Sequence, residues 1–314
     1  MNEVKVGIIG IGNMGYAHLQ TVTAGNIPDM TVTAVCDINP ERLKAANAEY
    51  PDIAAFGDYT DLLKNSDTNA VIIAVPHPLH AKIAIEAFEY GKHVLVEKPI
   101  DITVSAAEDL CAAARKSGKV FAVMFNQRTN GLFRKAREIV KSGELGEIKR
   151  SVWIITNWYR TQSYYDSGSW RATWRGEGGG VLLNQAPHNL DIWQWICGKP
   201  SAVTAFCNVG KFHNIEVEDE ATIYTEYENG ATGVFITSTG DCPGTNRLEI
   251  TGTRGKIVLE NGLLKLWKLK EDERDICKNS VEGFVTPETE YSEFTAEMEE
   301  AHAGILKNFA GAIL

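Results

Sequence analysis

Residues able to carry acid–base chemistry are concentrated in two short stretches of this 314-residue chain. The first is Glu97-Lys98-Pro99, which directly follows the apolar, strand-like run His93–Val96. In open α/β sheets the carboxyl ends of the strands face the ligand crevice. A lysine at such an end can have its pKa lowered by burial and can serve in proton transfer. The alternative is an ordinary solvated lysine at the end of a strand.

The second stretch contains Asn184, His188 and Asp191, whose spacing places them on one face of a helix. Asn184 can orient His188 or a substrate hydroxyl, but an amide cannot take up a proton. Asp191 is then the candidate partner of the histidine. Pro187 has no backbone N–H and should start or kink this helix, which we expect over about residues 181–197. A histidine considered alone is more often structural than catalytic.

A glycine-rich loop provides the clearest cofactor signal. The sequence Gly10-Ile11-Gly12-Asn13-Met14-Gly15 lies between a predicted strand and a predicted helix. Glycines there let the backbone approach a pyrophosphate, which then lies at the helix N-terminus. Asp37, at the end of the second strand, can accept hydrogen bonds from the adenosine ribose and would repel a 2′-phosphate, so NAD is favoured over NADP. Alternatively, Asp37 only caps the helix that starts near Pro40. Arg42 is close enough in sequence to weaken the preference for NAD over NADP.

An irregular segment at residues 158–175 is rich in aromatic and arginine residues. Flat aromatic faces and fixed guanidinium donors suit a ring that has apolar C–H faces and many hydroxyls. The alternative is that the tryptophans pack the loop against a sheet. Our candidates for substrate contact are Trp158, Tyr159, Tyr164 and Arg171.

Hydrophobic periodicity predicts two domains around these residues. In residues 1–125, short apolar strands alternate with amphipathic helices, which predicts a doubly wound parallel sheet. In residues 126–314, long alternating strands predict an α+β domain with a mostly antiparallel open sheet, which should bind substrate. Asn229-Gly230 and Asn261-Gly262 are strong signals for two-residue hairpins in that domain.

Together these motifs resemble the Gfo/Idh/MocA family, named for glucose–fructose oxidoreductase and inositol dehydrogenase. The resemblance covers essentially the whole chain and is carried by four motifs in order: Gly10–Gly15, Ala74–His80, Gly91–Pro99 and Gly178–Asp191. Many members have an aspartate four residues before the helix histidine. Here that residue is Asn184, as in the branch of sugar dehydrogenases with Asn-Gln-x-Pro-His.

The resemblance implies NAD(P)-dependent oxidation or reduction of a sugar, polyol or related alcohol. It implies that Lys98 and His188 contact the reacting hydroxyl, and that Pro76, His77 and Glu97 border the nicotinamide together with Lys98. For His80, packing at the start of a helix and contact with the cofactor are equally expected. His77 and His80 form an H-x-x-H pattern, but no third ligand is apparent and we expect no metal.

Three functions follow from this interpretation. The first is hydride transfer between nicotinamide and a carbinol carbon of a sugar, glycoside or polyol, in which Lys98 and His188 handle the proton and Asn184 orients. The second is NAD-dependent glycoside cleavage through a 3-keto intermediate. The third is a non-catalytic regulator that senses NAD and sugar, against which the presence of Lys98 and His188 argues.

Composition excludes other classes of protein. The net charge of -10 argues against nucleic-acid binding, and no apolar run is long enough to span a bilayer. The six cysteines are scattered, which is typical of buried thiols in a reducing compartment, so we expect a cytoplasmic protein. The resemblance implies a homodimer or homotetramer, in which the domain of residues 126–314 mediates oligomerisation. It also implies truncation, because the chain ends in a helix-like segment where relatives continue.

Overall fold

The computed structural model describes residues 3–295 and 300–314. Contacts between residues divide the chain into two compact units, and we describe each by itself. The first unit contains the residues up to Asn126, the short segment Arg175–Gly178 and the residues from Glu300 to Leu314. The second contains Gln127–Trp174 and the residues from Gly179 to the end of the described stretch at Thr295.

The first unit is built on a six-stranded sheet whose strand order is β3-β2-β1-β4-β5-β6. All five neighbouring pairs are parallel, which confirms the predicted doubly wound sheet. Its strands are β1 (Val4–Ile9), β2 (Met30–Cys36), β3 (Ala54–Phe56), β4 (Ala70–Ile73), β5 (His93–Val96) and β6 (Phe121–Val123). Its helices are α1 (Asn13–Thr23), α2 (Pro40–Glu49), α3 (Tyr59–Asn65), η1 (His77–Leu79), α4 (His80–Glu89), α5 (Val104–Ser117) and α10 (Ala301–Ile313).

Apolar cores cover both faces of this sheet, as near-continuous apolar strands require. On one face, Leu19 of α1 and Leu306 of α10 pack with Ile8 of β1. On the other, Leu62 of α3, Ile83 of α4 and Leu110 of α5 share a second cluster. Loops at the carboxyl ends of the parallel strands are thereby fixed on a rigid base.

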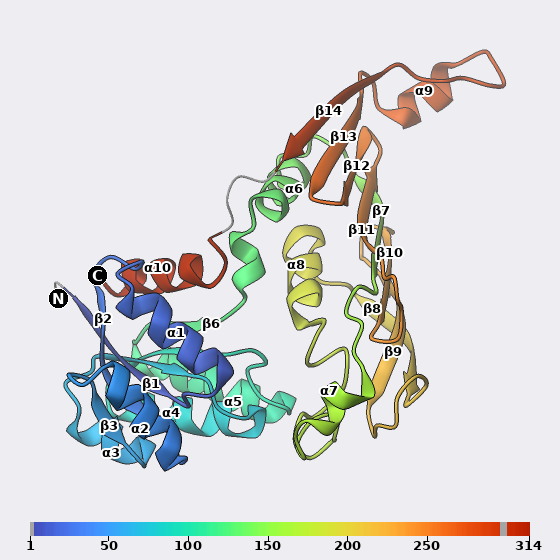
Figure 1. The fold of residues 1–314 in the computed structure, drawn as a ribbon. Coiled ribbons are helices and arrows are strands. Elements are labelled where there is room, and N and C mark those ends of the chain that lie inside the picture. Colours follow the sequence, from blue (N-terminus) through green and yellow to red (C-terminus); the bar gives the residue numbers. More distant parts are fainter. Residues whose placement is uncertain (1–2, 296–299) are drawn as a thin grey trace. The chain divides into compact units, whose positions relative to one another are not determined.

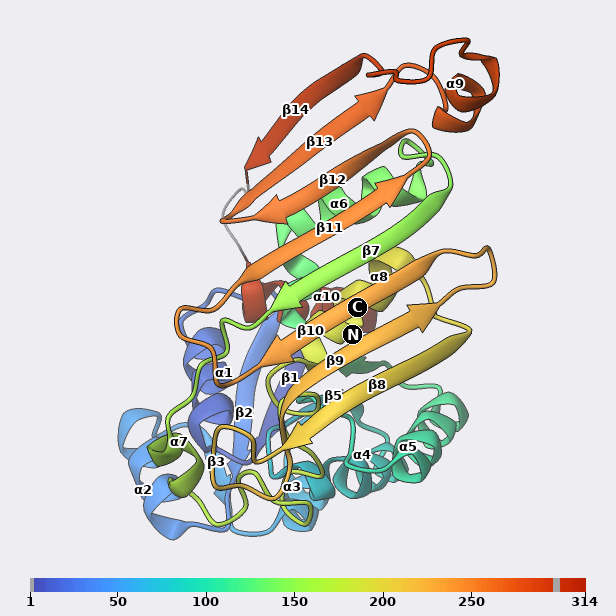
Figure 2. The same cartoon turned by 90° about the vertical axis from the view of Figure 1, so that its right-hand side faces the viewer.

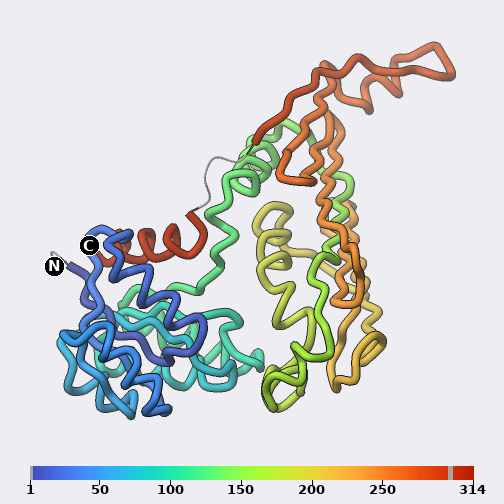
Figure 3. Tube along the Cα trace, viewed as in Figure 1, coloured from blue at the N-terminus to red at the C-terminus, as the bar shows by residue number. Residues whose placement is uncertain are grey.

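The last helix differs from the predicted division of the chain, which grouped residues 126–314 together. Phe309 and Ala310 of α10 are buried in the first unit, in the same cluster as strand β1. Figure 3 traces this red helix beside the blue N-terminal elements. The apolar face of α10 completes the core of the parallel sheet, and this explains its grouping with the first unit.

The second unit contains an eight-stranded sheet of order β14-β13-β12-β11-β7-β10-β9-β8, seen face-on in Figure 2. Every neighbouring pair is antiparallel except β10 and β7, so the prediction of a mostly antiparallel sheet is confirmed. Its strands are β7 (Ile148–Ile155), β8 (Ala202–Val209), β9 (Glu218–Glu226), β10 (Thr232–Ser238), β11 (Asn246–Gly252), β12 (Gly255–Glu260), β13 (Leu263–Leu269) and β14 (Thr289–Thr295). Its helices are η2 (Asn126–Thr129, which begins at the last residue of the first unit), α6 (Gly131–Lys141), α7 (Gln162–Asp166), α8 (Pro187–Cys197) and α9 (Glu273–Asn279).

Helices α6 and α8 cover one face of this sheet (Figure 1). Phe133 of α6 and Trp193 of α8 pack with Trp153 and Phe235 of the strands in one buried cluster. Trp193 stacks on Phe235 with ring centroids 5.5 Å apart. These aromatic contacts fix α8, the helix that carries His188, on the sheet.

Both Asn-Gly pairs lie in hairpins, but only the second hairpin has the predicted two-residue loop. The first loop contains five residues, Tyr227–Ala231. Asn229 and Gly230 lie between the antiparallel strands β9 and β10, and Gly230 has a φ of 81°. Asn261 and Gly262 join β12 to β13 with φ values of 51° and 72°, the left-handed conformation that these two residue types tolerate. Within the described ranges, no helix is long and apolar enough to cross a membrane.

Candidate functional site

The glycine loop at the carboxyl end of β1 has the shape that a dinucleotide pyrophosphate requires. Gly10 has a φ of 86°, and a Cβ on Gly15 would lie 1.8 Å from the Gly10 carbonyl oxygen, so both positions require glycine. By contrast, a Cβ on Gly12 would meet no described atom nearer than Arg42 Nη1, at 3.8 Å. The backbone is therefore open to a ligand beside Gly12.

The N-terminus of α1 begins immediately after this loop. Gly12 is its N-cap, no side chain among the described residues caps it, and its first turn contains no acidic residue. Asn13 and Met14 are exposed at this end. The unsatisfied N–H groups and the positive end of the helix dipole suit a phosphate, so these residues fit NAD.

Asp37 lies at the end of β2, where the sequence places the ribose-binding acid. Its side chain is buried, and it accepts hydrogen bonds from Ile11 N–H at 3.0 Å and Asn39 N–H at 2.8 Å. Helix α2 is capped by Asn39, which accepts from Glu41 N–H at 2.9 Å, so Asp37 is not the helix cap. Arg42 Nη1 lies 3.3 Å from Asp37 Oδ2, and most of the Arg42 side chain is exposed.

The Glu97-Lys98-Pro99 corner follows β5, as predicted. Burial lowers the pKa of the Lys98 ammonium below its ordinary value, whereas the charges of Glu97 and Glu177 raise it. Lys98 N–H donates to Glu97 Oε2 at 3.3 Å. Burial thus favours the neutral amine of Lys98, which is the form that can accept a proton.

A buried histidine supports this corner. Glu97 Oε1 lies 2.7 Å from Nε2 of His18, which projects from α1, and the ring of His302 from α10 lies edge-on to His18 at 5.6 Å. Burial opposes the ionisation of Glu97, but the hydrogen bond and charge of His18, with Lys98, hold the pKa of its carboxyl below its ordinary value. A Glu97 carboxylate beside Lys98 is therefore an ion held in place by three elements of the fold.

His77 and His80 take different positions near this corner. His77 is buried, its Nδ1 lies 3.2 Å from the carbonyl oxygen of Glu177, and burial lowers its pKa to about 4. The ring of His80 is fully buried between two carbonyl oxygens, those of Pro99 at 2.7 Å and Val75 at 2.8 Å. Both ring nitrogens of His80 are thus used by the protein. Of the two alternatives for His80, these contacts favour packing at the start of the helix over contact with the cofactor.

In the second unit, the buried carboxylate of Glu218 holds the glycine turn before α8. Glu218 Oε1 accepts from Gly180 N–H at 2.9 Å and from Leu182 N–H at 3.0 Å. A Cβ on Gly180 would lie 1.9 Å from the Glu218 carbonyl oxygen, so only glycine fits. The Gly180 carbonyl in turn accepts from Asn184 N–H at 2.9 Å. This chain of bonds fixes the backbone of Asn184.

The helix that carries His188 is shorter than predicted. It begins at Pro187, which occupies its first turn, and Asn184 lies in the turns before it. The expected helical face from Asn184 to Asp191 is therefore wrong in its first residue. Both His188 and Asn184 are half-buried.

The expected pairing of Asp191 with His188 is also corrected. Arg128 Nε donates to Asp191 Oδ2 and Arg128 Nη2 donates to Oδ1, each at 2.7 Å, so the two side chains form a bidentate pair. The Arg128 guanidinium also lies over the Trp195 ring at 5.5 Å. Asp191 therefore anchors α8 to the segment around Arg128, since both of its carboxylate oxygens are engaged there.

The aromatic segment after β7 forms a cluster around Tyr164. Arg171 lies over the Tyr164 ring at 4.5 Å and its Nη1 donates to the Tyr164 hydroxyl at 2.9 Å. Trp158 packs against the core cluster of the second unit, whereas Tyr159 is exposed. Tyr165 is buried in a small separate core with Ala172. Both alternatives given for this segment therefore apply, because some of its aromatic residues pack against the core and others are accessible to solvent.

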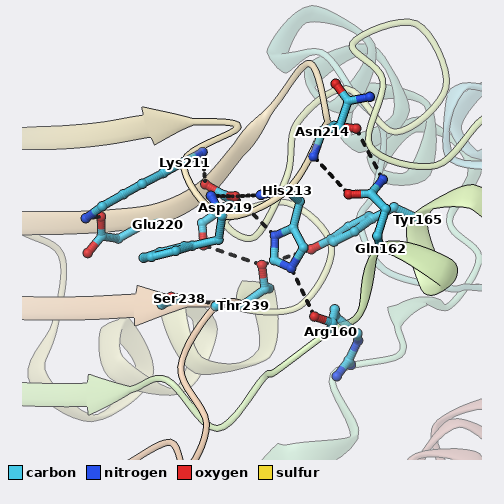
Figure 4. A network of polar contacts seen from close by, with 12 residues as sticks. Arg160, Gln162, Tyr165, Lys211, His213, Asn214, Asp219, Glu220, Ser238 and Thr239 are labelled. Atoms are coloured by element: carbon cyan, nitrogen blue, oxygen red, sulfur yellow. Dashed lines mark hydrogen bonds and ion pairs between the residues drawn. The ribbon is translucent and has the colours of Figure 1, made fainter.

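A polar network anchors this segment to the sheet (Figure 4). Asp219, fully buried on β9, accepts from His213 Nδ1 at 3.1 Å and from three backbone N–H groups of residues 211–213. His213 Nε2 donates to the Arg160 carbonyl at 3.0 Å, and Tyr165 donates to Thr239 at 2.9 Å. The backbone around Arg160 is therefore rigidly positioned.

Models of known families match both units. The model described as oxidoreductase family, NAD-binding Rossmann fold, matches residues 4–125, and the GFO/IDH/MocA C-terminal domain matches residues 133–258. The chain belongs to the GFO/IDH/MocA family. It is a NAD-binding oxidoreductase, and its relatives support a dehydrogenase that acts on CH–OH groups.

Among curated relatives of this GFO/IDH/MocA protein, an uncharacterized oxidoreductase, YrbE of Bacillus subtilis, is 30% identical over 82% of this chain and 74% of its own. A levoglucosan dehydrogenase of Pseudarthrobacter phenanthrenivorans is 28% identical with the same shares. Of the solved structures, the WlbA dehydrogenase of Chromobactrium violaceum, in complex with NADH and UDP-GlcNAcA, has a TM-score of 0.82 and 25% identity, covering 99% of this chain and 87% of that one.

Several residues of the site were not predicted from the sequence. His18 lies three residues after Gly15 on the buried face of α1. A histidine on the apolar face of a predicted helix was the sequence signal that could have indicated its role. Glu218 and Asp219 are two buried acids at the start of β9, where a run of acids in a strand was the signal. No sequence signal indicates that Arg128 pairs with Asp191. In the part of the chain that the structure describes, no group of three or more His, Cys, Asp or Glu side chains could hold a metal ion.

Proposed function

We propose that this protein oxidises a ring or chain alcohol of a carbohydrate or polyol, with Lys98 and His188 handling the hydroxyl proton. The observation that carries the proposal is the half-buried Lys98, whose pKa is lowered by burial, at the carboxyl end of a strand in a NAD-binding sheet. The relatives named for levoglucosan and myo-inositol, from Pseudarthrobacter phenanthrenivorans and Thermotoga maritima, support a polyhydroxylated substrate.

The reaction divides between the coenzyme and the residues of the chain. NAD, when bound, accepts a hydride at C4 of its nicotinamide. The neutral amine of Lys98 or the imidazole of His188 takes the hydroxyl proton as the carbinol carbon becomes a carbonyl carbon. Burial favours the neutral amine of Lys98, whereas the negative charge of Glu97 favours its ammonium form.

Residues of the second unit would bind and orient the alcohol. The Asn184 amide can donate to or accept from a hydroxyl without taking up a proton. We assign Trp158, Tyr159, Tyr164 and Arg171 to contact with the substrate ring, because aromatic faces and guanidinium donors match its C–H faces and hydroxyls. In the first unit, Pro76, His77, Glu97 and Lys98 would border the nicotinamide.

The test is Lys98→Met, measured over a panel of hexoses, glycosides and inositols as NADH formation. Loss of the amine should lower kcat by at least about 100-fold, the lower range for a general base. NADH binding, followed by fluorescence titration, should stay within about threefold because the glycine loop and Asp37 are intact.

The matched control is Lys92→Met. Lys92 directly precedes the same strand, β5, and is therefore away from the carboxyl ends of the strands. It is also partly buried, and its Nζ donates to the Thr68 carbonyl at 2.6 Å. Its variant should retain activity. Turnover by Lys98→Met at more than a tenth of the wild-type rate would refute the assignment of the base.

A further inference from the structure

Two arginines of the second unit lie against the same aromatic ring. The Cζ atoms of Arg160 and Arg171 lie 5.1 Å and 4.5 Å from the centroid of the Tyr164 ring. Arg171 also lies over the Trp170 ring at 4.6 Å, and Arg160 over the Trp158 ring at 5.9 Å. Two like charges are therefore held near each other on the segment that we assign to substrate binding.

Neither guanidinium has a carboxylate partner among residues 3–295 and 300–314. The acids around this segment are used in other ways. Asp219 is engaged by His213 and backbone N–H groups, Asp166 accepts from Gln162 at 3.0 Å, and Glu216 accepts from the backbone of Trp174 at 3.4 Å. None of these three carboxylates forms an ion pair with Arg160 or Arg171.

Each arginine has N–H donors that form no hydrogen bond to another described residue. Arg160 donates only through Nη1, to the carbonyls of Trp158 at 3.2 Å and Tyr159 at 2.9 Å. Arg171 likewise donates only through Nη1, to the Tyr164 hydroxyl. A guanidinium has five N–H donors, so Nε and Nη2 of both side chains remain without a hydrogen-bond acceptor in the described structure. The Tyr164 hydroxyl accepts from Arg171, which leaves its own proton available for donation.

The backbone under Arg160 is fixed at both of its polar groups. Its N–H donates to the Thr239 carbonyl at 2.9 Å, and its carbonyl accepts from His213 Nε2 at 3.0 Å. Figure 4 shows the His213 ring between Asp219 and Arg160. The two guanidinium cations repel each other, and an anion that accepts hydrogen bonds from both would reduce that repulsion.

The cluster adjoins the stretch that carries Asn184 and His188. Gln185 Nε2 lies 3.5 Å from the Tyr164 hydroxyl, and Trp158 packs against the core cluster that contains Ala186. Trp158 Nε1 is buried and has no hydrogen-bond acceptor among the described residues, so it is an additional donor in the same region. Donors therefore predominate here, whereas a site for neutral hydroxyls alone needs donors and acceptors together.

We propose that Arg160 and Arg171, with the Tyr164 hydroxyl, bind an anionic group on the substrate, either a carboxylate or a phosphate. This proposal rests on the proposed function and narrows its substrate class from carbohydrates in general to acidic sugars or sugar phosphates. The planar, multidentate guanidinium matches either oxyanion. Arg160 and Arg171 are then specificity-determining residues, and the chemistry at the carbinol carbon is unchanged.

The kinetic test compares three matched substrates: glucose, glucuronate and glucose 6-phosphate. Wild type should show the highest kcat/KM on one of the two anions, and that advantage should shrink as NaCl is raised. In Arg160→Gln/Arg171→Gln, the ratio of kcat/KM for the anion to that for glucose should fall about 10–100-fold, the range for charge-assisted hydrogen bonds. Arg171→Lys, which keeps the charge without the planar fork, should retain part of the ratio.

The matched control is Arg247→Gln in β11, an arginine that pairs with Glu249 and Glu260 away from this segment. It should leave the ratio unchanged. Preference for glucuronate identifies a carboxylate as the anion, and preference for glucose 6-phosphate identifies a phosphate. An equal ratio in wild type and the double variant, whose melting temperature confirms that it is folded, overturns the inference and leaves the proposed function standing.

A binding measurement separates this inference from the proposed function. If none of the three sugars reduces NAD, the proposed function fails for this panel. Titration calorimetry of glucuronate and glucose 6-phosphate into the NADH-bound protein then still tests the anion site. Binding by wild type that is lost in Arg160→Gln/Arg171→Gln supports the site. Absence of binding, or equal binding by both proteins, overturns it.

Discussion

Replacing Gly180 with alanine tests whether the glycine turn positions the residues before α8. The added Cβ would lie 1.9 Å from the Glu218 carbonyl oxygen and 2.8 Å from its carbonyl carbon, both backbone atoms. Glu218 begins strand β9, which pairs with β8 and β10 on its two sides and therefore cannot retreat. To reach an ordinary contact, the turn itself must move by about 1.5 Å.

Two costs follow from this movement. Overpacking against backbone costs about 1–3 kcal/mol, and loss of the bonds from Gly180 N–H and Leu182 N–H to the Glu218 carboxylate adds about 1.5–3 kcal/mol. We expect a destabilisation of about 3 kcal/mol or more, which lowers Tm by about 6–12 °C in a protein of this size. The Asn184 backbone moves with the turn, and a displacement of about 1 Å can reduce activity about 100-fold.

Differential scanning calorimetry and kcat/KM on the best substrate of the panel measure the two effects. Gly283→Ala is the matched control, because no described atom lies within 4 Å of a Cβ built there. It should leave both values unchanged. If Gly180→Ala melts within about 1 °C of wild type and keeps more than half of its activity, the turn does not position Asn184 and the argument is refuted.

Two further predictions concern the first unit. Glu97→Gln removes a negative charge that raises the pKa of Lys98, so the Lys98 pKa should fall further. The acidic limb of the pH–kcat/KM profile for alcohol oxidation should then move down by about 1 pH unit. An upward shift of this limb would contradict the electrostatic coupling between Glu97 and Lys98. Asp37→Ser removes the charge that repels a 2′-phosphate, so the ratio of kcat/KM with NAD to that with NADP should fall at least about tenfold, and an unchanged ratio would show that Asp37 does not select the coenzyme.

The fold was predictable because its main patterns are local and repeated. Apolar runs such as Val4–Ile9, alternation in the second half and Asn-Gly hairpins each follow from short-range backbone chemistry. The packing of α10 was not predictable in this way. Its apolar stripe indicates only that one face is buried, and Phe309 reaches the β1 layer through long-range contacts that no local pattern encodes.

The candidate site was predicted to a similar extent. Lys98 follows a buried strand and Asp37 ends another, so the rule for strand ends located both. The expected partner of His188 was wrong because helical spacing ranks Asp191 by proximity along the helix, whereas Arg128 offers it a bidentate partner from a distant segment. Sequence spacing describes neighbours on one element and cannot rank competitors from another.

The position of α10 has a consequence for how the protein is made. Leu306, Phe309 and Ala310 complete a core whose other members begin at Val4, and His302 lies against His18 beside Glu97. A ribosome that has finished residues 4–126 has therefore synthesised every strand of the parallel sheet but not its last layer. Synthesis of the coenzyme-binding unit therefore begins first and ends last, after all strands of the eight-stranded sheet have emerged from the ribosome. An expressed Rossmann fragment would need residues 300–314 joined to it to close its core.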